Sequence, residues 1–236
     1  MPSEAGDPEE PADGFADGLT EGLAAATGNA AFVLALRERG VRDTTVLRAM
    51  ERVPRGRFAP PALRAYARRD IALPLACGQT MTAPSIVAAM LGALDIAPGA
   101  RVLEVGTGTG YVTALLVQLG AAHVRSLERY EGLARTARTH LGRDFDEAAV
   151  ETADGLAPEV VRGGSYDRIL LNGSLAALPP HLPAALKSGG RLVAGFWTGR
   201  ASRLVTLTRD GAAAFARTEG PALRLGPLTP GRALTP

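Results

Sequence analysis

The chain has 236 residues, 46% of them hydrophobic, which is enough to bury one substantial core, and one domain is expected at this size. A single cysteine, Cys77, excludes an intrachain disulfide, and with only three histidines no metal site is expected. No apolar run reaches the ~20 residues of a membrane span, and the acidic N-terminus is unlike a secretory signal. These features predict a cytoplasmic protein without a membrane partner.

The net charge of +2 hides an uneven distribution of charge along the chain. Residues 1–36 contain seven acidic residues and no Lys or Arg, which leaves 17 of the 24 acidic residues and all 26 basic residues in the rest. No basic cluster is interleaved with aromatic residues, so the basic excess indicates solvated helix surfaces and no nucleic-acid partner. Residues 1–20, rich in Pro, Gly, Asp and Glu, are predicted to form a disordered acidic tail.

The N-terminal part of the chain predicts helices separated by loops. Helices are expected at residues 30–39, 44–52 and 83–94. Gly40 and Pro54 would end the first two, and Pro84 lies in the first turn of the third, where its missing N–H costs nothing. We therefore expect one domain over residues 21–236, with a cap and substrate loop over 21–95 and a core over 96–236.

Strands and helices alternate from residue 101 onward. Strands are expected at residues 101–105, 123–128, 150–152, 166–171, 191–196 and 203–209, and helices at 110–119, 131–141 and 180–186. This α/β alternation with short connections predicts a mostly parallel, doubly wound sheet covered by helices on both faces. The last two strands have no helix between them, which predicts an antiparallel hairpin at the C-terminal edge.

The strongest local signal is the glycine-rich turn GTGTG at residues 106–110, between an expected strand and an expected helix. Glycine permits positive φ there and lets a ligand approach the main-chain N–H groups closely. The spacing differs from the GxGxxG pattern of pyrophosphate-binding turns. A purely structural turn is the alternative interpretation.

Acidic residues accompany this turn. Glu104 precedes the first glycine, and Glu128 ends the next strand, where a carboxylate can accept hydrogen bonds from both ribose hydroxyls. Asp154 follows the third strand and either accepts from an adenine amino group or is only a turn residue. S-adenosylmethionine, which has ribose and adenine but no pyrophosphate, fits this set. The predicted cofactor-binding residues are Glu104, Gly106, Thr107, Gly108, Gly110, Glu128, Arg129, Asp154 and Gly155.

Several motifs, in the same order, resemble the protein-L-isoaspartate O-methyltransferase family from about Val41 to the C-terminus. They are Val53-Pro54-Arg55 with Phe58, Leu73-Pro74, residues 78–84 (GQTMTAP), residues 102–111 (VLEVGTGTGY), Glu128, Asp154-Gly155, Tyr166-Asp167 and Gly189-Gly190-Arg191-Leu192. The resemblance implies a Rossmann-like methyltransferase fold with an N-terminal helical cap. It also implies methyl transfer from S-adenosylmethionine to the α-carboxylate of L-isoaspartyl residues in damaged proteins, a repair reaction that yields S-adenosylhomocysteine.

A carboxylate acceptor is already ionised at neutral pH, so the lack of a Ser-His-Asp set is no objection to this chemistry. In the family, the segment that matches residues 78–82 closes over the cofactor with a hydroxyl near the reacting carboxylate. Thr82 supplies that hydroxyl here, and it is predicted to contact the substrate, to cap the helix after it, or to do both. The other predicted substrate-loop residues are Gly78, Gln79, Thr80, Met81 and Asn172.

The acceptor side departs from the family pattern. The family usually has Ser at the position of Thr82, a run such as TAA at Asn172-Gly173-Ser174, and Pro-x-Gly within residues 194–197. Three interpretations therefore stay open: general isoaspartyl repair, a carboxyl methyltransferase dedicated to one peptide or protein, and a non-catalytic S-adenosylmethionine-binding interaction protein. Isoaspartyl proteins or peptides are the expected partners, a monomer is favoured, and loops 78–82 and 198–202 are expected to close over the substrate.

Overall fold

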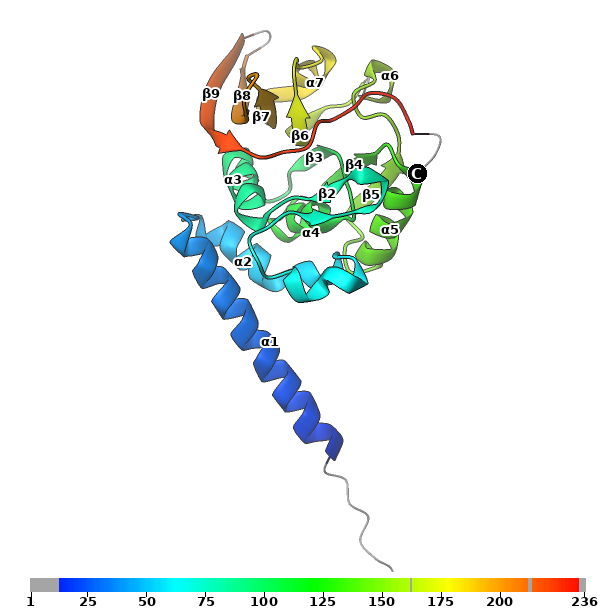
Figure 1. Cartoon of the computed structure of the whole chain (residues 1–236). Coiled ribbons are helices and arrows are strands. Elements are labelled where there is room, and N and C mark those ends of the chain that lie inside the picture. Colours follow the sequence, from blue (N-terminus) through cyan, green and yellow to red (C-terminus); the bar gives the residue numbers. More distant parts are fainter. Residues whose placement is uncertain (1–12, 162, 212–213, 234–236) are drawn as a thin grey trace, which may run out of the picture.

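The computed structural model describes residues 13–161, 163–211 and 214–233 (Figure 1). Its main sheet has seven strands in the order β5-β4-β3-β6-β7-β8-β9. The strands are β3 (Arg101–Val105), β4 (His123–Glu128), β5 (Ala148–Thr152), β6 (Tyr166–Leu175), β7 (Leu186–Trp197), β8 (Ser202–Asp210) and β9 (Ala214–Leu223). The first five in this order are parallel, and β8 and β9 are antiparallel to their neighbours. The predicted mostly parallel sheet with an antiparallel C-terminal edge is confirmed.

Alternate residues along the strands face opposite sides of this sheet and build two cores. On one side, Val102, Leu170 and Val193 are fully buried in a cluster with residues of the helices α1 to α4. Their neighbours Leu103 and Ile169 are fully buried in a second cluster on the other face. Because side chains alternate between the two faces along each strand, both faces of the sheet are covered, as the alternation of strands and helices predicts.

Seven helices and a small hairpin surround the sheet within the described residues. The helices are α1 (Asp13–Glu38), α2 (Thr44–Arg52), α3 (Pro84–Leu94), α4 (Tyr111–Gln118), α5 (Glu131–Leu141), α6 (Pro158–Val161) and α7 (His181–Ala184). Between α2 and α3 lie 3₁₀ turns at Arg55–Arg57, Pro61–Tyr66 and Ala76–Gly78, and the two-residue strands β1 (Leu73–Pro74) and β2 (Thr80–Met81) pair with each other. This hairpin carries the predicted substrate loop.

Helix α1 differs from the expected disordered tail over residues 1–20. Its 26 residues begin at Asp13, so the part of that tail from Asp13 onward is helical, while residues 1–12 lie outside the described residues. In Figure 1 the N-terminal half of α1 extends away from the other elements. No described helix, α1 included, has the length and apolarity needed to cross a membrane.

Other differences from the expected elements lie in the C-terminal third. The helix expected at 180–186 ends earlier, because Leu186 is buried in the sheet as the first residue of β7 and pairs with Tyr166. Strand β6 continues beyond its expected end through Asn172 to Leu175. Strand β9 was not predicted. Nearly all of its positions are exposed, so it lacks the alternation that marks a half-buried strand.

The N-terminus of helix α2 is stabilised by a side-chain N-cap, whose contribution to stability can be tested directly. The Asp43 carboxylate accepts hydrogen bonds from the N–H groups of Thr45 (2.9 Å) and Val46 (3.0 Å) at the start of α2. Replacing Asp43→Ala should lower the free energy of unfolding by about 1 kcal/mol, whereas Asp43→Asn, which caps equally well, should change it little. Chemical denaturation measures both variants, and equal values for the Ala and Asn variants would contradict the capping role.

Candidate active site

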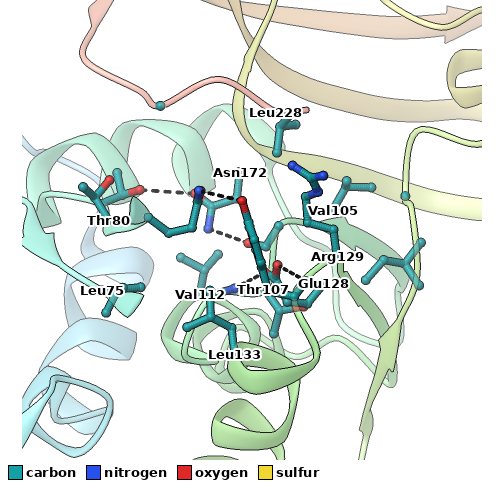
Figure 2. Close-up of a pocket in the computed structure, with 18 of the residues that line it drawn as sticks. Leu75, Thr80, Val105, Thr107, Val112, Glu128, Arg129, Leu133, Asn172 and Leu228 are labelled. Atoms are coloured by element: carbon teal, nitrogen blue, oxygen red, sulfur yellow. Dashed lines mark hydrogen bonds between the residues drawn. The ribbon is translucent and has the colours of Figure 1, made fainter. Parts of the chain in front are cut away.

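The loops that follow β3, β4 and β5 meet the C-terminal part of β6 at the carboxyl edge of the sheet and enclose a cleft that is partly open to solvent. Figure 2 shows Leu75 and Thr80 on one side of this cleft and Arg129 and Leu228 on the opposite side. The predicted residues that line it are Gln79, Thr80, Met81, Thr82, Gly106, Thr107, Gly108, Glu128, Arg129, Asp154, Gly155 and Asn172. Three other predicted residues, Gly78, Glu104 and Gly110, lie outside the lining.

The glycine-rich turn forms one wall of the cleft. Gly106 has φ +95°, and a Cβ there would lie 3.3 Å from both the carbonyl oxygen of Asn172 and Cδ2 of Leu228. A side chain at residue 106 would therefore be strained and crowded. Gly110 instead packs behind the turn, where an added Cβ would lie 3.3 Å from Cβ of Ala137 on α5. Gly106 therefore leaves its main chain accessible from the cleft, and Gly110 allows α4 and α5 to pack closely.

Glu128 lies at the end of β4 and is held by main-chain amides. Its carboxylate accepts from the Gly108 N–H at 2.9 Å and from the Tyr130 N–H at 3.0 Å. Burial raises the pKa of Glu128, and these amide hydrogen bonds oppose that rise. Each carboxylate oxygen retains a lone pair, so a ligand with two adjacent hydroxyls in the cleft can bind both.

Glu104 lies behind the glycine-rich turn and is completely buried. Its Oε2 accepts from the hydroxyls of Thr113 (2.5 Å) and Ser126 (2.6 Å), whereas its Oε1 has no partner. Burial raises the pKa of Glu104 to about 7. The Glu104 side chain does not line the cleft, so Glu104 has no direct contact with a ligand bound there.

Asn172 joins the two halves of the cleft. Its Nδ2 donates to the Gly106 carbonyl at 3.1 Å, and its Oδ1 accepts from the Thr82 hydroxyl at 3.4 Å. Thr82 does not cap α3, because the N-cap residue is Ala83, which makes no side-chain capping bond. The hydroxyl of Thr82 is therefore directed across the cleft toward β6.

The remaining substrate-loop residues lie beside the same wall. Gln79 donates from Nε2 to the Cys77 carbonyl (3.2 Å) and to the Tyr130 hydroxyl (3.5 Å), so it connects this loop to the residues after β4. Gly78 precedes it with φ +65°, and the lone cysteine also has positive φ, at 59°. The chain therefore reverses sharply just before the segment that lines the cleft.

A segment that the sequence did not reveal covers one side of the site. We name residues 224–233, after β9, the C-terminal strap; Figure 1 shows it crossing the carboxyl edge of the sheet. It pairs with β6, since the Ser174 N–H donates to the Gly226 carbonyl (2.8 Å) and the Leu228 N–H donates to the Ser174 carbonyl (2.9 Å). The strap contributes four residues to the lining: Gly226, Pro227, Leu228 and Thr229.

Two predicted cofactor residues hold this strap. Asp154 accepts the Gly231 N–H at 2.6 Å on Oδ2, and the Leu156 N–H at 2.9 Å on Oδ1. Arg129 donates from Nε to the Gly231 carbonyl at 2.8 Å. Asp154 is therefore a turn residue and an anchor for the strap at once, and the Arg129 side chain is engaged by the strap.

The departures from the family pattern on the acceptor side make room for the strap. A Cβ at Gly173 would lie 2.6 Å from Cγ of Leu228, and one at Gly195 would lie 2.8 Å from Cδ1 of Leu225. Both distances are shorter than carbon atoms tolerate, so a side chain at Gly173 would displace Leu228, and one at Gly195 would force the end of the Leu225 side chain to move. Trp197, at the end of β7, is 51% exposed and does not line the cleft.

The family model described as protein-L-isoaspartate(D-aspartate) O-methyltransferase (PCMT) matches residues 27–231. The chain belongs to this family. The match includes the cap, the glycine-rich turn, β6 and most of the strap, so every segment that lines the cleft lies within it.

Individual members are similar over most of their length. The protein-L-isoaspartate O-methyltransferase of Xanthobacter autotrophicus is 43% identical over 210 residues, which cover 87% of this chain and 93% of that relative. The one from Azorhizobium caulinodans is 42% identical over 180 residues, covering 75% and 81%. A crystal structure of a candidate PCMT from Plasmodium falciparum, in complex with S-adenosyl-L-homocysteine, has a TM-score of 0.72 at 20% identity and covers 84% and 97%. That likeness shows the shared Rossmann-like methyltransferase fold.

The buried Glu104 predicts a dependence of stability on pH. The folded chain holds a proton on Glu104 between its ordinary pKa of 4.5 and the raised pKa of about 7, where the unfolded chain has released it. The free energy of unfolding should therefore fall as pH rises through this window, by on the order of 3 kcal/mol, and level off above it. The variant Glu104→Gln, whose amide oxygen can still accept from Thr113 and Ser126, should flatten this fall.

Chemical denaturation of the ligand-free chain at pH 5, 6, 7 and 8 measures the effect. Glu147→Gln, at an exposed position, is the matched control and should run parallel to the unsubstituted chain. An unchanged pH dependence in Glu104→Gln would show that Glu104 does not hold this proton.

Proposed function

We propose that this chain transfers a methyl group from S-adenosylmethionine to the α-carboxylate of L-isoaspartyl residues in damaged proteins or peptides, and so acts in protein repair. The observation that carries the proposal is the coincidence of family and site, because the family match over residues 27–231 includes every residue that lines the cleft. We further propose that it acts as a monomer in the cytoplasm.

The residues of the cleft fit S-adenosylmethionine. Glu128 would accept the two ribose hydroxyls with the lone pairs that Gly108 and Tyr130 leave free. The main chain at Gly106 lies open to the amino-acid part of the cofactor, and the free lone pairs of Asp154 would accept the adenine amino group. The carboxylate of Glu128 also makes the cleft favourable for a cationic sulfonium.

When bound, the cofactor supplies an activated methyl group and leaves as S-adenosylhomocysteine. The chain's own residues would then hold the acceptor carboxylate in line with that methyl group and keep water away. The Thr82 hydroxyl would donate a hydrogen bond to the carboxylate. Its present hydrogen bond to Asn172 is long, at 3.4 Å, so replacing it with one to the substrate costs little. No residue has to accept a proton, since the acceptor is ionised at neutral pH. Loops 78–82 and 198–202 would close over the site.

The ribose assignment predicts a loss of cofactor affinity in Glu128→Ala. Charge-assisted hydrogen bonds to the ribose would be lost, which should weaken binding of S-adenosylhomocysteine by about 1–3 kcal/mol. Glu128→Gln, which retains one acceptor oxygen but not the charge, should lie between Ala and the unsubstituted chain. Isothermal titration calorimetry measures all three affinities, and unchanged binding in Glu128→Ala would remove Glu128 from the ribose site.

The activity itself is tested with labelled S-adenosylmethionine and a short isoaspartyl peptide, beside the same peptide with a normal aspartyl residue. We expect label on the isoaspartyl peptide alone. Thr82→Val, which removes the hydroxyl at nearly constant volume, should lower kcat/KM for the peptide with little effect on cofactor affinity.

Absence of label from both peptides, with cofactor binding confirmed by calorimetry, would contradict general repair. That outcome would instead support a dedicated peptide substrate or a non-catalytic cofactor-binding role.

A further inference from the structure

A buried arginine lies directly beneath the substrate loop. Arg55 is 3% exposed and belongs to the 3₁₀ turn Arg55–Arg57 that follows α2. Its guanidinium donates to main-chain carbonyls, from Nη1 to Ala67 at 3.0 Å and from Nη2 to Ile71 at 3.1 Å. The same Nη2 also donates to the carbonyls of two consecutive residues of the substrate loop, Met81 (3.2 Å) and Thr82 (3.1 Å).

Burying the charged guanidinium of Arg55 costs free energy, which an apolar side chain that only filled this space would not cost. Burial lowers the pKa of Arg55 to about 10, so the side chain still carries its charge at neutral pH. All of its hydrogen bonds given above end on neutral carbonyls, and its buried Nε has no partner. The Asp70 carboxylate interacts favourably with this charge but accepts none of these hydrogen bonds, and a buried charge held mainly by neutral groups stabilises a protein little. The planar guanidinium does, however, set the relative positions of the four carbonyls that it joins.

The segment after Thr82 is anchored from a second side. The Asp70 carboxylate accepts the Ser85 N–H at 2.8 Å in the first turn of α3, and it also pairs with Arg39 at 2.6 Å. Arg55 thus holds the carbonyl groups of the substrate loop, and Asp70 holds the amide that follows it. Between these two anchors, only the Thr82 side chain is directed across the cleft, toward Asn172.

We propose that Arg55 is a positioning residue for methyl transfer, which orients the Thr82 hydroxyl by fixing the main chain of Met81 and Thr82. The inference rests on the proposed function of this site and extends it to a residue outside the cleft. Arg55 touches neither substrate nor cofactor in this account, and it acts on the reaction only through Thr82.

The first test compares Arg55→Lys with Arg57→Lys. Arg57 belongs to the same turn and also donates to main-chain carbonyls, but those belong to His140 and Leu141 at the end of α5. The ammonium of Lys cannot reach carbonyls as far apart as the guanidinium does. Arg55→Lys should lower kcat/KM for an isoaspartyl peptide by about tenfold or more while affinity for S-adenosylhomocysteine changes little, because a small misplacement of a contacting group is costly. Arg57→Lys should leave kcat/KM nearly unchanged, and an equal loss in both variants would overturn the proposal.

The second test asks whether Arg55 acts through Thr82. In a Thr82→Val background the hydroxyl is absent, so Arg55→Lys should cost less than about threefold in kcat/KM. A merely structural role would give the same fold loss in both backgrounds, and that result would overturn the proposal. If Arg55→Lys does not fold, Asp70→Ala loosens the same segment at Ser85, and it should show the same dependence on Thr82.

The third test does not depend on activity. Hydrogen exchange of peptides spanning residues 79–86 should be faster by about tenfold in Arg55→Lys and unchanged in Arg57→Lys. Unchanged exchange in Arg55→Lys would overturn the positioning role even if the enzyme is active. Exchange could be faster in Arg55→Lys while the unsubstituted chain is inactive on isoaspartyl peptides. That result would support the positioning of Thr82 by Arg55 and would reject only the proposed function.

Discussion

Five parallel strands of this protein end at one edge of the sheet, and several main-chain groups beyond those ends have no strand partner. Buried main-chain polar groups must be paired, so side chains take over the pairing. The Glu128 carboxylate accepts the amides of Gly108 and Tyr130, and the Asn172 side chain donates to the Gly106 carbonyl. The residues that complete the backbone pairing are therefore the same ones that face the cleft.

The C-terminal strap follows from the same requirement. It pairs with β6 at Ser174, and Asp154 and Arg129 bind its main chain at Gly231. Leu225 and Leu228 then fill the spaces left by the glycines of β6 and β7. This packing accounts for the glycines at positions 173 and 195 on the acceptor side.

The position in the cleft of most of the residues expected to bind the cofactor could be predicted from the sequence, because these residues follow consecutive strands. The glycine-rich turn and Glu128 end neighbouring parallel strands, and such strands bring their carboxyl ends together. Asp154 was recognised in the same way, but its bond to Gly231, 77 residues away, has no local signal in the sequence. The long-range contacts of the strap arise only from tertiary packing.

Exposure and burial explain the other differences. Strand β9 is exposed along nearly all of its length, so its pairing with β8 leaves no hydrophobic pattern to identify. Arg55 belongs to a motif that the resemblance included, yet an arginine in a motif does not reveal that it is buried or that it binds carbonyls. The positioning role proposed for Arg55 rests on its distances to the carbonyls of Met81 and Thr82, which no local pattern in the sequence indicates.

The most direct measurement is a crystal structure of this chain with S-adenosylhomocysteine. Both ribose hydroxyls should lie within about 3 Å of the Glu128 carboxylate. Leu228 should lie against the cofactor, and the strap should still be bonded to Asp154. A ribose bound away from Glu128, or a strap displaced from Asp154 by the cofactor, would contradict the account of how this edge of the sheet forms the site.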